Sequence, residues 1–201
     1  MTKKRTTRRD AKTNVKTAKG RKTSSTKWLK RQLNDPYVAK AQLDGYRGRA
    51  AYKLVEIDEK INLLEPNMMV VDLGCAPGGW CQVAAQKGCK VVGLDLLETD
   101  PIENCTLLQM DFMDDDAPDK LIAAMNGEKA DIIMSDMAPN TTGHKNTDHL
   151  RIMALVELAY HFAGDVLKPG GTFIAKVRQG GTQNELLAQM KHDFKTIKHI
   201  K

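Results

Sequence analysis

The sequence has no apolar run long enough to cross a membrane. None of its segments approaches the roughly 18 consecutive apolar residues that a membrane-spanning helix needs. The residues that follow Met1 are mostly Lys, Arg and Thr, so we expect no secretory signal peptide. Apolar residues still make up 41% of the 201 positions, which is enough for a core, and the length suits one globular domain plus a tail. We therefore expect a cytoplasmic protein without a membrane partner.

Cysteine is scarce, and its spacing fits neither a disulfide framework nor a metal site. The chain has four cysteines, with no C-x-x-C pair and no histidine at zinc-ligand spacing. So few cysteines in a chain of this length argue against a secreted, disulfide-linked fold. We expect reduced, mostly buried thiols and no bound metal. The four residues are Cys75, Cys81, Cys89 and Cys105.

Acidic residues are almost absent from the amino-terminal end. Residues 1–31 contain thirteen Lys or Arg and one acid, Asp10, a net charge of +12, whereas the remaining 170 residues carry −6. Residues 1–26 have too few apolar side chains to offset the entropy of ordering them, so we expect a disordered basic arm over 1–26 and a folded domain over 27–201. Such an arm is attracted to nucleic-acid phosphate. Its composition also suits a mitochondrial presequence, or a tail without a partner.

Short apolar stretches alternate with amphipathic ones from residue 48 onward. The predicted helices cover 48–61, 80–86, 120–125, 148–166 and 184–192. The predicted strands cover 68–71, 90–94, 106–108, 131–134, 172–177 and 196–200. Strands that alternate with helices in this way indicate an α/β fold, in which a mostly parallel central sheet has helices on both faces.

A glycine-rich turn follows the first predicted strand, where residues 72–80 read DLGCAPGGW. Glycine lets the backbone turn sharply and approach a ligand closely, so Gly74 and Gly78 are candidate binding residues. The dinucleotide fingerprint G-x-G-x-x-G is absent. Pro77 lacks a donor N–H and suits the first turn of a helix. The loop therefore fits a ligand without phosphates, since a pyrophosphate favours many free N–H groups.

Carboxylates stand at the ends of the next two predicted strands. Asp95 is placed to accept hydrogen bonds from both hydroxyls of an adenosine ribose. Asp111 and Phe112 combine an acceptor for an exocyclic amine with an aromatic ring that covers a flat base. Ligands of α/β sheets bind at consecutive strand ends, so these residues predict one site. Its carboxylates suit S-adenosylmethionine, whose sulfonium is a fixed positive charge.

Taken together, these motifs resemble the FtsJ/RrmJ-type ribose 2′-O-methyltransferases, most closely the bacterial branch that modifies large-subunit ribosomal RNA. The similarity covers about residues 24–201 and rests on 72–80, 111–112, SDMAPN at 135–140, KPGG at 168–171 and 176–177, in the family's order. It implies a Rossmann-like S-adenosylmethionine methyltransferase fold. It also implies cofactor contacts by Gly78, Trp80, Asp95, Asp111 and Asp136.

The same resemblance implies a catalytic set of Lys, Asp, Lys and Glu, of which Lys53, Asp136 and Lys176 match three members. A ribose hydroxyl is a very weak acid, so its methylation needs a base or a strong cationic partner. We assign Lys176 as the base, Asp136 as its orienting partner and Lys53 as support for the developing alkoxide. The family's Glu, on a final antiparallel strand, has no counterpart before Lys201. We therefore expect that strand to be missing and the domain to be incomplete.

The reaction expected from these residues is S-adenosylmethionine-dependent 2′-O-methylation of a uridine in 23S ribosomal RNA, within an assembled 50S subunit. Methylation of a base amine favours a [D/N/S]-P-P-[Y/F/W] loop, and methylation of a pyrimidine carbon needs a nucleophilic Cys; neither follows the fourth predicted strand. We expect a monomer whose RNA-binding residues are Lys27, Lys30, Arg31, Arg47 and Arg49.

Two other interpretations remain open at this point. The missing Glu favours an RNA-binding ribosome assembly factor that holds the cofactor but turns over poorly or not at all. Other branches of the family act on tRNA or on the mRNA cap, so the same chemistry with a different RNA target is the second alternative.

Overall fold

The computed structural model describes residues 35–139, 142–177 and 184–200. The chain divides into two compact units, one that extends to Arg49 and one that starts at Ala50. The predicted arm over residues 1–26 lies outside the described residues, as do Lys27, Lys30 and Arg31.

The described part of the first unit contains one helix, α2 (Pro36–Leu43). Asp35 caps its amino terminus, because the Oδ1 atom accepts a hydrogen bond of 2.9 Å from the backbone N–H of Tyr37. Pro36 suits the first helical position, where a backbone donor is not needed. The guanidinium group of Arg49 contacts the same Asp35 carboxylate.

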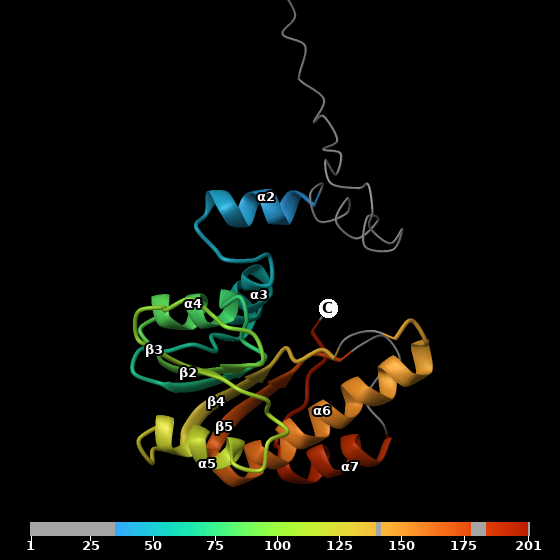
Figure 1. The fold of residues 1–201 in the computed structure, drawn as a ribbon. Helices are drawn as coiled ribbons and strands as arrows, with labels where there is room; N and C mark the ends of the chain where they lie inside the picture. The colour runs from blue at the N-terminus through green and yellow to red at the C-terminus, as the bar shows by residue number, and fades with distance from the viewer. Residues whose placement is uncertain (1–34, 140–141, 178–183, 201) are drawn as a thin grey trace, which may run out of the picture. The chain divides into compact units, whose positions relative to one another are not determined.

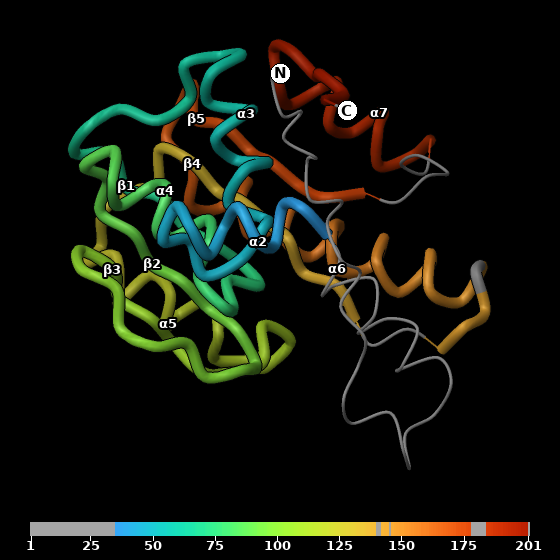
Figure 2. Tube along the Cα trace, turned by 90° about the horizontal axis from the view of Figure 1, so that it is seen from above, coloured from blue at the N-terminus to red at the C-terminus, as the bar shows by residue number. Residues whose placement is uncertain are grey.

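The second unit is built on a five-stranded parallel sheet with the order β3-β2-β1-β4-β5 (Figures 1 and 2). Its central strand is apolar except for one aspartate, and every residue of it is buried. This burial on both faces is what a parallel sheet with two helical layers requires. The strands are β1 (Met69–Leu73), β2 (Lys90–Asp95), β3 (Cys105–Gln109), β4 (Ala130–Ser135) and β5 (Leu167–Ala175).

Helices cover both faces of this sheet (Figure 1). On one face lie α3 (Ala51–Ile61) and α4 (Gly79–Gln86). On the other lie α5 (Ala117–Ala124), α6 (Lys145–Val166) and α7 (Asn184–Asp193). Val71 and Leu73 of β1 pack into one hydrophobic cluster with residues of α5 and α6. The predicted Rossmann-like α/β fold is therefore confirmed.

Several boundaries differ from the predicted ones by a few residues. Helix α3 starts at Ala51 rather than at 48, and α6 starts three residues before the predicted position. Pro77 precedes α4, which starts at Gly79, and so it is not part of the first helical turn as we expected. Residues 168–171, predicted as a turn, loop out within β5, because Ala130 pairs with Leu167 and Ile132 pairs with Thr172.

The prediction of a strand over residues 196–200 is wrong. These residues form no strand, and β5 pairs only with β4 among the described residues. An apolar and β-branched composition favours a strand, but a strand also needs a hydrogen-bonded neighbour. Residues 196–200 instead contribute Thr196, Lys198, His199 and Ile200 to the wall of a cavity beside β5.

The prediction of reduced and mostly buried thiols is confirmed. All four cysteines are free; three of them are buried and Cys105 is half-buried. Gly93 on β2 makes room for two of the sulfurs, because a Cβ atom there would lie 3.0 Å from Cys75 Sγ and 3.1 Å from Cys81 Sγ. None of the helices within the described ranges combines the length and the apolar character that a membrane span needs.

Candidate functional site

Charged side chains gather at the carboxyl ends of the parallel strands, which is where α/β sheets bind their ligands. Three carboxylates form what we call the acidic half: Asp72 near the end of β1, Asp95 at the end of β2 and Asp111 just after β3. A second group forms what we call the lysine half: Lys53 on α3, Asp136 directly after β4 and Lys176 directly after β5. The two halves therefore share one edge of the sheet.

The glycine-rich loop after β1 is held against both neighbouring strands. The backbone N–H of Gly74 donates a hydrogen bond of 2.8 Å to Leu94 O of β2. Gly74 has φ +82°, and a Cβ atom there would lie 2.8 Å from Met137 N and 2.9 Å from Met137 Cα, after β4. Close packing of two loops therefore requires this glycine, in addition to any approach of a ligand. Gly78 has φ +105° and leads directly into α4.

Asp95 links the glycine-rich loop to the end of β2. Its Oδ2 atom accepts a hydrogen bond of 2.9 Å from the N–H of Ala76, and its Oδ1 atom accepts one of 2.8 Å from the N–H of Leu97. A carboxylate oxygen can accept more than one hydrogen bond. Asp95 can therefore hold the loop and still accept hydrogen bonds from ribose hydroxyls, as its position in the sequence predicts.

Asp111 and Phe112 have separate environments although they are adjacent. Asp111 Oδ1 accepts a hydrogen bond of 2.9 Å from the N–H of Met113, which holds the turn after β3. The Phe112 ring is only 8% exposed and packs edge to face against Phe162 at 5.8 Å between ring centroids. This ring packs into the hydrophobic core, and its contact with a flat base stays a prediction.

Apolar side chains that the sequence analysis did not single out are better exposed at these strand ends. Leu96 and Leu97 follow Asp95, and Met113 follows Phe112; their side chains are 62%, 67% and 65% exposed. The sequence pattern that could have identified them is an apolar residue shortly after a strand-end carboxylate. A flat base needs such surfaces beside the carboxylate that binds its sugar or its amine.

Asp72 is a buried carboxyl group at the centre of the sheet. It is 1% exposed, and its Oδ2 atom accepts a hydrogen bond of 3.2 Å from the thiol of Cys81. Burial raises the pKa of Asp72 to about 7, and the nearby charges of Asp136 and Asp95 act in the same direction. The sequence analysis placed Asp72 in the loop motif without giving it a function.

The lysine half is positioned by the backbone of three adjacent strands. The N–H of Asp136 donates a hydrogen bond of 3.1 Å to Leu73 O of β1, and the N–H of Lys176 donates one of 2.9 Å to Ser135 O of β4. Asp136 and Lys176 are thereby placed on neighbouring strand ends. Their side chains form an ion pair and remain 22% and 40% exposed. Both groups are therefore accessible to a substrate.

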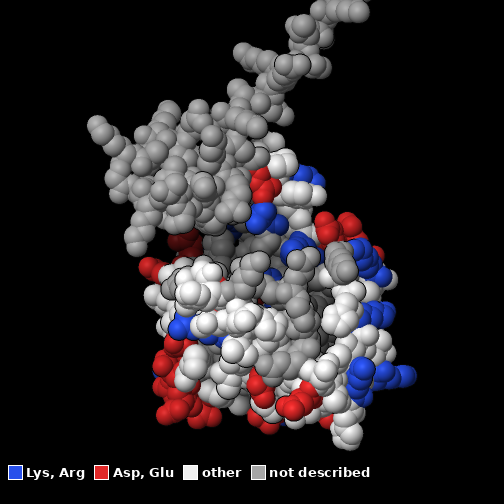
Figure 3. Space-filling view, turned by 90° about the vertical axis from the view of Figure 1, so that its right-hand side faces the viewer, with Lys and Arg blue, Asp and Glu red and all other residues white. Residues whose placement is uncertain are grey.

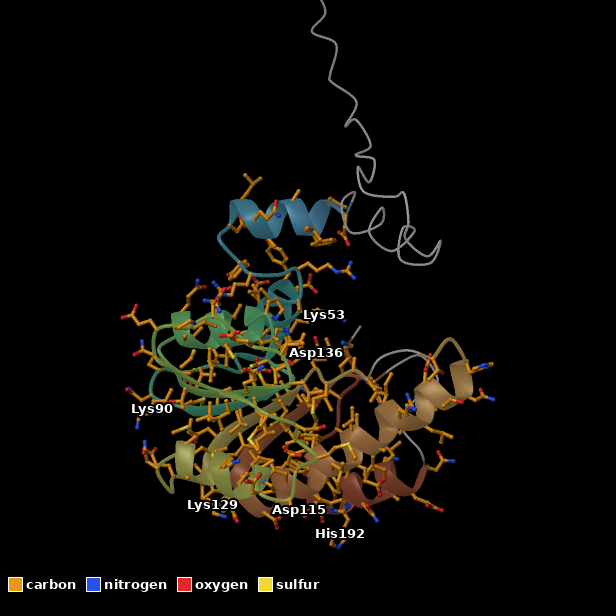
Figure 4. All side chains as sticks on the ribbon, viewed as in Figure 1. Lys53, Lys90, Asp115, Lys129, Asp136 and His192 are labelled. Carbon is orange, nitrogen blue, oxygen red and sulfur yellow. The ribbon has the colours of Figure 1, made fainter. Side chains whose placement is uncertain are left out.

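Lys53 reaches the same region from α3. Lys53, Trp80 and Lys176 line one cavity of about 430 Å³. The indole N–H of Trp80 donates a hydrogen bond of 2.8 Å to Ala50 O, directly before α3, and this contact holds the start of that helix. Figure 4 shows Lys53 of α3 and Asp136 close together, at the carboxyl ends of the strands. The structure therefore brings together the three side chains predicted to be catalytic.

The predicted RNA-binding residues are only partly described. Arg49 is exposed, and its guanidinium group contacts Asp35. Arg47 also lies in the first unit, which is described by itself. In the face drawn in Figure 3, acidic side chains gather at the lower left and basic side chains at the right.

Comparison with known proteins agrees with this arrangement. A family model for FtsJ-like methyltransferases matches residues 46–201. The chain is 62% identical over 188 residues to the ribosomal RNA large subunit methyltransferase E of Maricaulis maris (strain MCS10), and the match covers 93% of this chain and 67% of that protein. It is 60% identical over 194 residues to the protein of the same name from Bradyrhizobium sp. (strain BTAi1 / ATCC BAA-1182), with coverage of 93% and 83%.

Solved structures extend the comparison to the fold. A Plasmodium falciparum protein described as a ribosomal RNA methyltransferase superposes with a TM-score of 0.72 at 36% identity, over 78% of this chain and 91% of that one. The MycE methyltransferase of mycinamycin biosynthesis superposes with a TM-score of 0.50 at 17% identity, over 68% of this chain and 39% of that one, which shows a shared fold alone. From the family match over residues 46–201 and the close relatives, we conclude that the chain belongs to the FtsJ-like methyltransferase family.

Proposed function

We propose that this protein transfers a methyl group from S-adenosylmethionine to the 2′-oxygen of a uridine ribose in 23S ribosomal RNA of the large subunit. The observation that carries the proposal is the ion pair of Lys176 and Asp136 in a site that Lys53 also lines, next to the acidic half. The curated relatives, named ribosomal RNA large subunit methyltransferase E, support the RNA target. An RNA target of this kind places the enzyme in the cytoplasm.

The acidic half fits the proposed cofactor. S-adenosylmethionine supplies a methyl group on a positively charged sulfur, and its positive charges favour a site with several carboxylates. We assign Asp95 to the ribose hydroxyls and Asp111 to the adenine amine. Gly74 and Gly78 shape the loop that faces the cofactor, and Trp80 is proposed as a further contact. The buried Asp72, with an oxygen that accepts no hydrogen bond from any described residue, is consistent with a cationic ligand nearby.

The lysine half supplies the chemistry at the ribose. The Lys176 amine, in its neutral form, accepts the proton of the 2′-hydroxyl as methyl transfer proceeds, and Asp136 holds that amine in position through their contact. Lys53 adds positive charge in the same cavity and stabilises the developing alkoxide. Fixing the oxygen in line with the methyl group and the sulfur removes much of the entropy cost of the reaction.

The basic residues of the amino-terminal region are proposed to bind RNA phosphate. A set of basic residues provides positive charge at the start of the methyltransferase domain, whereas residues 32–201 carry a net charge of −6. These residues are Lys27, Lys30, Arg31, Arg47 and Arg49. Binding through phosphate contacts is independent of sequence and weakens with salt. We propose that the enzyme acts as a monomer and that the shape of the ribosomal subunit selects the target nucleotide.

The proposal is tested with two lysines, Lys168 within β5 and Lys176 directly after it. Lys176 pairs with Asp136 at one end of the β4–β5 pair, and Lys168 pairs with Asp131 at the other, with Nζ–Oδ2 at 2.8 Å. We expect Lys176→Ala to slow methyl transfer to isolated large subunits by about 10²–10⁴-fold, the usual contribution of a general base. Lys168→Ala removes an ion pair of the same kind away from the site, so it should keep the transfer rate and lose about 1 kcal/mol of stability at most.

Two readouts decide the result. Incorporation of labelled methyl groups into large subunits measures the rate, and resistance of the labelled nucleotide to alkaline cleavage shows that the ribose oxygen is modified. Equal rates for Lys176→Ala and the wild-type protein would reject the catalytic assignment and favour an assembly factor. Label in tRNA instead of ribosomal RNA would change the substrate and keep the mechanism.

A further inference from the structure

Asp72 is a buried acid that the proposed mechanism leaves without a function. It lies on β1, level with Gly93 of β2 and Met134 of β4, so strands flank it on both sides. Its Oδ1 atom accepts no hydrogen bond from any residue in the described part of the chain. An ionised carboxylate at 1% exposure, without a cation to balance it, is costly.

The groups around Asp72 supply hydrogen-bond donors from one residue, Cys81, and two negative charges. Cys81 of α4 donates its S–H to Oδ2, and the thiols of Cys75 and Cys105 lie against Cys81. Asp95 at the end of β2 and Asp136 after β4 are close enough to repel a charge on Asp72. Both aspartates belong to the proposed cofactor site. Because Lys176 contacts Asp136 rather than Asp72, that lysine does not remove the need for a cation.

We propose that Asp72 is a positioning residue of the cofactor site: its carboxyl group is protonated while no cofactor is bound, and it releases this proton to solvent when the cationic cofactor binds. The O–H bond of the carboxyl group breaks, the proton goes to the buffer, and the resulting carboxylate balances the positive charge of the ligand. This inference rests on the proposed function, since it takes S-adenosylmethionine as the ligand.

The physical basis is that cofactor binding and proton release by Asp72 depend on each other. Burial of Asp72 raises its pKa to about 7, so the neutral form is well populated near neutral pH. A cation close to the three carboxylates favours the ionised form, and by linkage the ionised form binds the cation more tightly. Cofactor affinity should therefore rise with pH up to about pH 8 and then level off.

Titration calorimetry of the full chain in buffers of different ionisation enthalpy measures the released protons. We expect S-adenosylmethionine to release about half a proton per site at pH 7 and to bind about tenfold more weakly at pH 6 than at pH 8. Asp72→Asn should abolish this release and flatten the affinity profile. The amine of the ligand titrates equally with both proteins, so their difference isolates Asp72.

Two comparisons keep the test decisive. S-adenosylhomocysteine lacks the sulfonium charge and should release fewer protons than S-adenosylmethionine does. Cys81→Ala removes the thiol that donates a hydrogen bond to the ionised form of Asp72, so the midpoint of proton release should move to higher pH. This variant provides a test even if Asp72→Asn does not fold.

The results separate this inference from the function on which it rests. If S-adenosylmethionine binds and the wild-type protein releases no more protons than Asp72→Asn, or the Cys81→Ala midpoint stays in place, the inference is overturned and cofactor use stands. Equal release with both ligands also overturns it, because the sulfonium would not be the cause. If S-adenosylmethionine does not bind at all, the proposed function and this inference fail together.

Discussion

The acidic half and the lysine half share one edge of the sheet, but they place a carboxyl group in opposite environments. Asp72 on the central strand is 1% exposed, and its Oδ2 atom accepts a hydrogen bond from the thiol of Cys81. Asp136, after the next strand, is 22% exposed and pairs with Lys176. The sheet therefore keeps one carboxyl group short of positive charge and supplies the other with it.

The position of each strand in the sheet accounts for this contrast. Strand β1 lies between β2 and β4, and all of its residues are buried. Strand β5 pairs only with β4 in the described part of the sheet, and most of its residues are half-buried. A lysine ammonium needs water or room for its hydrated head, so it is found at the β5 end. The residues near the carboxyl ends of β1 and β2 are carboxylates and glycines, which suit a cationic ligand.

The largest effect is expected where the loop after β1 touches the loop after β4. Gly74→Ala puts a Cβ atom 2.8 Å from Met137 N and forces an L-residue to φ +82°. We expect a loss of about 4 kcal/mol in the free energy of unfolding, because the left-handed backbone costs about 1–2 kcal/mol and overpacking costs a further 1–3 kcal/mol. Urea unfolding measures this loss. S-adenosylmethionine binding should also weaken in the variant that remains folded.

Gly127→Ala is the matched control for that substitution. Gly127 has a similar φ of +73°, but a Cβ atom there meets no described atom within 4 Å. This variant should lose only about 1–2 kcal/mol, from the backbone alone, and keep its cofactor affinity. Equal losses in the two variants would show that the contact between the loops does not hold the halves together.

The next effect concerns the pH dependence of stability. The pKa of Asp72 is raised in the folded protein to about 7, from 3.8 when unfolded, so folding takes up a proton between these values and stability falls as pH rises through this range. Asp72→Asn removes this penalty. The stability of the variant relative to the wild type should therefore increase by about 2 kcal/mol from pH 5 to pH 7, at no more than 1.36 kcal/mol per pH unit.

Urea unfolding at pH 5, 6, 7 and 8 measures this trend. The contributions of other acids to the pH dependence cancel when the variant is compared with the wild type. Asp131 is an example: burial opposes its ionisation, but its ion pair with Lys168 and the hydrogen bond from Met69 outweigh burial. The pKa of Asp131 is therefore low in both proteins. The difference should level off above pH 7. A difference that does not vary with pH would show that Asp72 is ionised throughout, like a carboxylate of the lysine half.

The smallest effect separates a structural from a binding role for Trp80. The ring is 5% exposed and donates a hydrogen bond of 2.8 Å to Ala50 O, before the helix that carries Lys53. Trp80→Phe should cost about 1 kcal/mol of stability through loss of that bond. Because Trp80 is also proposed to contact the cofactor, we expect weaker S-adenosylmethionine binding, measured by calorimetry, and slower methyl transfer, measured by methyl incorporation. Lower stability with unchanged cofactor affinity would limit Trp80 to the structural role.

The candidate site was largely predictable because its residues follow strands with strong local signals. Lys176 and Asp136 each come directly after an apolar run, and parallel strands bring their carboxyl ends to one edge. The burial of the Phe112 ring was not predictable, because an aromatic residue after a strand gives the same sequence pattern whether its ring faces solvent or packs against Phe162. The strand over residues 196–200 was wrong because composition does not show whether a neighbour is available for pairing.

The sequence by itself determined the alternation of strands and helices, the glycine-rich loop, and the identity of the charged residues at the strand ends. These are local properties, set by hydrophobic periodicity and backbone freedom over a few residues. Only the tertiary structure decided that Gly74 packs against the loop after β4, that Asp72 is buried and forms no ion pair with a described residue, and that Lys176 pairs with Asp136. Burial and charge pairing depend on which strands are neighbours, and that choice is made by packing between segments far apart in the chain.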